Sequence, residues 1–151
     1  MPPDLAVVAD VTDSLARLVR SATLPRFMER VAGRAGVQLD RSATVLLARL
    51  AERPRRVGEL AELLCLDVST VSRQVHSLEQ GGLARREPHP TDRRGSVVVI
   101  DDQGRAALEQ HRRARREIFA ELLADTSPTE LEAVARLLDR LAGRIDELAG
   151  S

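Results

Sequence analysis

The chain lacks several residue types on which many protein classes depend. Its 151 residues include no Trp, no Tyr, no Lys, two Phe and a single cysteine. One cysteine cannot form an intramolecular disulfide, and no apolar run approaches the roughly 18 residues of a membrane-spanning helix. With so few aromatic side chains the core must be aliphatic. Because Leu, Ala and Val dominate, we expect a mainly α fold.

Signals of secretion and catalysis are also missing. The N-terminus, Met1-Pro2-Pro3-Asp4, lacks the basic and then apolar layout of a secretory signal, so the expected location is cytoplasmic. His76, His89 and His111 have no metal-binding spacing. The sequence contains no glycine-rich phosphate loop, nucleophile elbow or paired-carboxylate cleft. We therefore expect neither an enzyme nor a cofactor.

Charge is balanced overall but divided unevenly along the chain. The formal net charge is zero, which argues against a nucleic-acid partner. However, residues 53–116 hold 13 arginines against 9 acidic residues, and residues 117–151 hold 3 against 8. Arginine suits bidentate recognition of phosphate and guanine, although a GC-rich coding sequence is the simpler explanation for the absence of Lys. The middle of the chain is therefore basic and its C-terminal part acidic.

Proline and glycine divide the first half of the chain into helices. Apolar spacing predicts a helix over about 5–31 that is interrupted at Pro25. Asp40 caps a second helix, which runs to about residue 51. Residues 57–80 contain two short helical patterns joined by only a few residues around Cys65-Leu66-Asp67. Such a short join is typical of a helix-turn-helix.

The second half predicts a hairpin followed by two long helices. Residues 83–87 and 96–100 read as strands joined by the charged loop 88–95, and Asp101 caps a helix to about residue 124. Ser127-Pro128-Thr129-Glu130 combines an N-cap, proline at the first helical position and a capping-box Glu. The last helix has apolar residues at the spacing of a dimerisation seam, namely Leu131, Val134, Leu138, Leu141, Ile145 and Leu148.

The second helix of the helix-turn-helix has a polar surface suited to reading DNA. Its apolar residues Val68, Val71, Val75 and Leu78 fall on one side. Among the polar residues, Arg can bind guanine, Gln can pair with adenine, and hydroxyls can hold phosphates. A solvated face is the commoner reading of a single amphipathic helix, but the tight turn and the adjoining hairpin favour DNA. The candidate contacts are Ser69, Thr70, Ser72, Arg73, Gln74 and His76.

The tip of the hairpin is a second candidate DNA contact. Arg94 can enter a narrow minor groove, and Asp92 can orient it. A charged loop tip is otherwise most often solvated, but this one directly follows a helix-turn-helix. Candidate backbone contacts are Arg85, Arg86 and Arg93, and weaker phosphate candidates are Arg55 and Arg56.

These segments together resemble the MarR family of winged helix-turn-helix regulators. The resemblance rests on STVSRQVHSLEQGGLARREPHPTDRRG at 69–95, followed by a strand and then DDQGR at 101–105. It implies a single unit over 1–151 with a DNA-binding lobe at 40–100, dimerisation helices at 1–35 and 102–151, and a hairpin that forms the wing. One departure is Ile100-Asp101-Asp102, where many members have Leu-Thr; Asp101 can still cap the helix.

The resemblance also implies a function. It points to a homodimeric repressor that binds a pseudo-palindromic operator in double-stranded DNA, with the helix after Asp67 in the major groove and the wing arginine in the minor groove. Family members release DNA when a small phenolic or other anionic effector binds, or when a cysteine is oxidised. No motif locates an effector site. Cys65 lies among leucines and reads as a buried small hydrophobe. The alternative, to which the zero net charge points, is a winged-helix protein-interaction module without operator binding.

Overall fold

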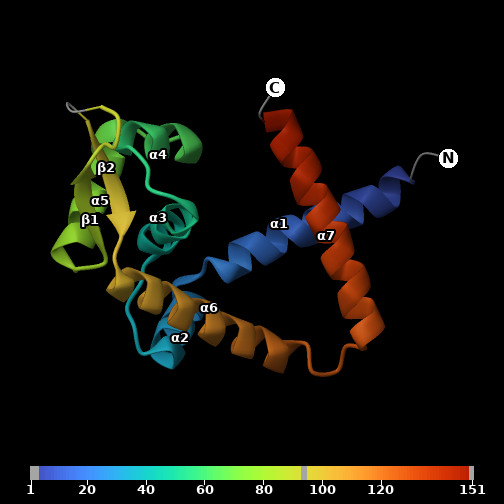
Figure 1. Ribbon diagram of the computed structural model, residues 1–151. Coiled ribbons are helices and arrows are strands. Elements are labelled where there is room, and N and C mark those ends of the chain that lie inside the picture. Colours follow the sequence, from blue (N-terminus) through green and yellow to red (C-terminus); the bar gives the residue numbers. More distant parts are fainter. Residues whose placement is uncertain (1–3, 93–94, 150–151) are drawn as a thin grey trace. The chain divides into compact units, whose positions relative to one another are not determined.

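The computed structural model describes residues 4–92 and 95–149, and these residues form a mainly helical fold with one hairpin (Figure 1). This confirms the predicted winged helix-turn-helix class. Over the described residues the elements are α1 (Leu5–Ala22), α2 (Pro25–Ala35), α3 (Arg41–Glu52), α4 (Val57–Leu64), α5 (Val68–Gln80), β1 (Ala84–Pro88), β2 (Ser96–Ile100), α6 (Asp102–Leu122) and α7 (Pro128–Ala149).

Local sequence signals set the helix ends. Pro25 is the first residue of α2, where its missing N–H has no helical partner to lose. Asp40 caps α3, since its Oδ1 accepts the Ala43 N–H at 2.7 Å. The capping box before α7 is complete: the Ser127 N–H donates to Glu130 Oε2 at 3.0 Å, and the Glu130 N–H donates to Ser127 Oγ at 3.3 Å. All three predicted signals are confirmed.

The winged lobe packs around an aliphatic core. Its helices α3, α4 and α5 lie against the hairpin and the start of α6 (Figure 1). The hairpin is antiparallel, with pairs running from Ala84 opposite Ile100 to Pro88 opposite Ser96. Each fully buried aliphatic side chain contributes about 1.5–3 kcal/mol relative to exposure. The most deeply buried members of this core are Leu46, Leu47, Leu50, Leu60, Val71, Val75 and Val98.

The turn between α4 and α5 contradicts the expectation of a buried Cys65. Cys65 is exposed, because it ends α4 in a left-handed conformation with φ 51°. Val68 is 57% exposed, since it begins α5 one turn before Val71, the first buried residue of that helix. Asp67 stands at the N-cap, but its side chain makes no cap hydrogen bond; its backbone oxygen accepts the Thr70 N–H instead.

The chain divides into two compact units, residues 1–115 and 116–151, with the boundary inside α6. The division expected near residue 101 stays a prediction. In the first unit, α1 has no buried residue among those described. In the second, the six seam residues of α7 are 36–81% exposed. No helix within 4–92 and 95–149 combines the length and the apolar character needed to cross a membrane.

Gly104 allows α6 to begin against the start of the hairpin. A Cβ at this position would overlap the Leu83 carbonyl oxygen and lie 3.0 Å from Ile100 Cγ1. We predict that Gly104→Ala lowers the free energy of unfolding by about 1–3 kcal/mol, because overpacking outweighs the helix propensity of alanine. Urea denaturation measures the change. The matched control is Gly143→Ala in α7, where a Cβ meets no atom within 4 Å; equal effects of the two substitutions would contradict the packing role.

His111 makes stability depend on pH. The side chain is only 2% exposed, and neither ring nitrogen has a hydrogen-bond partner in the described part of the chain. Burial lowers the pKa of His111, and the charge of Arg115 lowers it further. The folded state therefore favours the neutral ring, whereas the unfolded chain takes up a proton as the pH falls through the ordinary value of 6.5.

We accordingly predict that the free energy of unfolding decreases as the pH falls from about 7.5 to 5, and that His111→Leu makes this decrease smaller. Urea denaturation across the pH range measures both slopes. His76→Gln, which removes an exposed histidine, is the control and should leave the slope unchanged. Identical slopes in the parent and in His111→Leu would exclude His111 as the cause.

Candidate nucleic-acid interface

The outer face of α5 presents a short polar row. Ser69, Arg73 and His76 are exposed and share a face at helical spacing, opposite the buried Val71 and Val75. An Arg73 Nη donates to Thr70 Oγ1 at 3.3 Å, which helps to hold the guanidinium along the helix. These side chains carry hydrogen-bond donors and acceptors of the kinds that read base edges in the major groove.

Gln74 faces the scaffold instead. Its Nε2 donates to Ser42 Oγ in α3 at 3.2 Å, and the contact is partly buried. Thr70 and Ser72 are also only half-exposed. Sequence reasoning missed Ser42, because nothing local links positions that lie 32 residues apart. The base-reading role of Gln74 stays a prediction, and it would require the amide to leave Ser42.

The loop between β1 and β2 is held by its own polar groups. His89 Nδ1 accepts the N–H groups of Thr91 at 3.3 Å and Asp92 at 3.2 Å, and the Gly95 N–H donates to the Asp92 carbonyl at 3.0 Å. Arg93 and Arg94 lie outside the described residues, so their predicted groove contacts stay predictions. Within the described loop Asp92 forms an ion pair with Arg56 at 3.0 Å.

The two arginines of β1 are paired with acids. Arg85 binds Glu87 at 2.6 Å and also Asp101, and Arg86 Nε lies 3.2 Å from Glu79 of α5. Hydrogen bonds that Arg85 donates to Asp101 and Glu87 raise the pKa of Arg85, so this side chain stays charged. A DNA phosphate would have to displace these carboxylates to bind either guanidinium.

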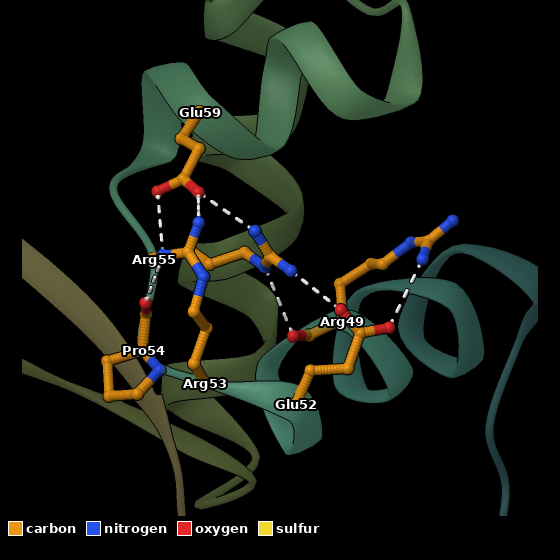
Figure 2. Close-up of polar contacts among 6 residues, drawn as sticks. All are labelled: Arg49, Glu52, Arg53, Pro54, Arg55 and Glu59. Atoms are coloured by element: carbon orange, nitrogen blue, oxygen red, sulfur yellow. Dashed lines mark hydrogen bonds and ion pairs between the residues drawn. The ribbon is translucent and has the colours of Figure 1, made fainter. Parts of the chain in front are cut away.

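A polar cluster joins the end of α3 to the start of α4 (Figure 2). Arg55 is only 8% exposed. Its guanidinium binds Glu52 at 2.6 Å, Glu59 at 2.8 Å and the Arg49 carbonyl at 3.2 Å. Arg53 also binds Glu59. This cluster places the guanidinium of Arg55 inside the protein rather than toward a phosphate.

Ionisation of the two acids in this cluster favours the folded state. The hydrogen bond from Arg55 lowers the pKa of Glu52. Burial opposes ionisation of Glu59, but the hydrogen bonds from Arg53 and Arg55 outweigh it and lower the pKa of Glu59. Both carboxylates are therefore charged near neutral pH, as the arginines require. No group of three or more His, Cys, Asp or Glu side chains that could hold a metal occurs in the part of the chain that the structure describes.

Comparisons with known proteins identify relatives of this chain. The sequence model of the MarR family matches residues 39–96. The uncharacterized HTH-type transcriptional regulator YxaD of Bacillus subtilis is 39% identical over 104 residues, which cover 68% of this chain and 73% of that protein. The multiple antibiotic resistance protein MarR of Salmonella typhimurium is 30% identical over 84 residues, which cover 55% of this chain and 58% of that protein.

Solved structures agree in fold. A MarR family protein from Bacillus stearothermophilus matches with a TM-score of 0.78 at 23% identity, covering 96% of this chain and 99% of the other. A probable transcriptional regulator from Pseudomonas aeruginosa matches with a TM-score of 0.62 at 32% identity, covering 87% and 98%. The chain belongs to the MarR family of helix-turn-helix transcriptional regulators, which are DNA-binding proteins and not enzymes.

Proposed function

We propose that this chain is a homodimeric repressor that binds a pseudo-palindromic operator, with α5 in the major groove of each half-site and the wing in the adjacent minor groove. The main support for this proposal is the exposed row of Ser69, Arg73 and His76, which lies on a helix whose opposite side is buried in the core. A rigid helix that displays such a row is the usual reader of the major groove. Repression follows when the bound dimer blocks polymerase.

The exposed apolar residues of α7 support the dimer. Leu138 is 40% exposed and Leu141 is 36% exposed, although both lie on a seam with the spacing of a helix that packs along a partner. Water contact with so continuous an apolar stripe is unfavourable. A second copy of the chain would cover this stripe and set two α5 helices about 34–36 Å apart, one turn of DNA.

A groove beside α5 supports control by a small molecule. Its volume is about 450 Å³, within the range of small-ligand sites, and it touches both α2 and the end of α5. The acidic residues Glu29 and Asp40 also line it, so an uncharged or cationic effector suits this groove better than an anionic one. Its apolar lining consists of Met28, Ala32, Leu39, Ala43, Leu78 and Leu83.

The DNA-binding role is tested by selecting duplexes from a random pool with the parent protein and measuring affinity by fluorescence anisotropy across a salt series. We predict that Arg73→Ala and Arg94→Ala each weaken binding to the selected duplex by about 1–3 kcal/mol. Arg136→Ala removes an exposed arginine from α7 and should leave affinity nearly unchanged.

Two outcomes would count against this function. Equal affinity of the parent and both variants would reject the assigned contacts. Failure of the parent to bind any duplex at low salt would favour the winged-helix protein-interaction module, whose apolar contacts do not weaken steeply with salt.

Charged substitutions on the apolar seam of α7 test the proposed dimer. We predict that Leu138→Glu with Leu141→Glu shifts the protein from dimer to monomer, because two carboxylates cannot be buried in an apolar seam without partners. Sedimentation velocity measures the mass. Ala133→Glu is the control: Ala133 is exposed and lies on a face of α7 away from the seam. An unchanged mass for the double variant would reject the seam.

A further inference from the structure

One contact links the wing directly to the helix-turn-helix. Arg56 is the N-cap residue of α4, and one of its Nη atoms lies 3.0 Å from Asp92 Oδ2 in the loop between the strands. Thirty-six residues separate the two in sequence. The contact is therefore tertiary: it joins the first residue before α4 to the tip of the hairpin.

Both ends of this ion pair are fixed by their surroundings. On one side, Arg55 pairs with Val98 of β2 through both of its backbone groups, with N···O distances of 3.2 Å and 2.8 Å; this holds the chain at Arg56 alongside the hairpin. On the other side, the Asp92 N–H is bound by His89 and the Asp92 carbonyl by Gly95. The carboxylate thus belongs to a residue whose backbone is hydrogen-bonded through both its N–H and its carbonyl group.

We propose that Arg56 is a positioning residue for DNA binding: its ion pair with Asp92 sets the angle at which the wing leaves the helix-turn-helix, so that the wing meets the minor groove while α5 occupies the major groove. The inference rests on the proposed function. It replaces the earlier expectation that Arg56 contacts phosphate, since the guanidinium is already directed at Asp92.

The pair acts on geometry rather than on stability. The side chains of Arg56 and Asp92 are 47% and 43% exposed, and ion pairs this accessible to water contribute little to unfolding free energy. The direction of the hairpin is more sensitive to this contact than the unfolding free energy is. A small rotation at the base of a hairpin displaces its tip by a larger distance. Loss of the pair should therefore leave the fold intact and weaken the wing contacts selectively.

A double-mutant cycle on DNA binding tests this role. The probe is a duplex of about 30 base pairs, selected by the parent protein from a random pool and long enough for two half-sites one turn apart. The variants are Arg56→Gln, Asp92→Asn and their combination. We expect each single variant to lose about two- to fivefold in affinity and the combination to lose no more than either, because both break the same water-accessible contact. Arg56→Asp with Asp92→Arg, which reverses the pair, should recover affinity relative to Arg56→Asp alone.

Footprinting separates the wing from α5. In Arg56→Gln, hydroxyl-radical protection of the minor groove should be lost, whereas protection of guanine N7 from methylation in the major groove should remain. Circular dichroism and the urea midpoint confirm that each variant is folded. The control is Arg49→Gln, which breaks an exposed pair with Glu52 inside α3 and should change neither footprint.

The alternatives give different results. If Arg56 contacts phosphate directly, Arg56→Gln and Asp92→Asn act additively, and Arg56→Gln alone lowers the salt slope by about one; this would overturn the inference while leaving the proposed function in place. Loss of both footprints together would also overturn it. If the parent selects no duplex, the proposed function itself fails, and the inference fails with it.

Discussion

Arg55 is the residue on which the winged lobe depends most, because it ties three elements together. Its guanidinium is satisfied by Glu52 at the end of α3, by Glu59 in α4 and by a backbone carbonyl (Figure 2), and its own backbone pairs with Val98 of β2. A charge so poorly accessible to water persists only with such partners. The helix-turn-helix and the wing therefore share one anchor.

The pairing of arginine with acid extends from this anchor to the candidate DNA surface. Arg56, Arg85 and Arg86 each face a carboxylate, which explains how a chain with zero net charge carries so many guanidiniums in its lobe. Long-range attraction to DNA is weak for a neutral protein. If Arg85 and Arg86 contact phosphate in the proposed complex, binding there would require exchange of their carboxylate partners for phosphate. Such exchange would be favourable only where the duplex fits the surface, so charge balance would suppress non-specific binding more than specific binding.

Structural features that depend on near neighbours in sequence could be predicted, whereas contacts between distant segments could not. Asp40, Pro25 and the capping box before α7 define helix ends through atoms a few residues apart, and a sequence displays these directly. Periodicity also identified the buried face of α5, but not its limit, because whether Val68 is covered depends on where the neighbouring elements end. The pair between Arg56 and Asp92 left no local signal at all, since either residue alone reads as a solvated charge.

The same apolar spacing has opposite consequences in α5 and α7. In α5 it coincides with burial, because α3, α4 and the hairpin supply a core within one chain. In α7 every seam residue is exposed, and a helix owes most of its stability in water to the packing of its apolar face. The seam thus calls for a surface from outside its own helix, and in the proposed dimer a symmetric copy supplies it. In that proposed dimer, residues that never touch DNA would contribute to operator preference alongside the reading face of α5.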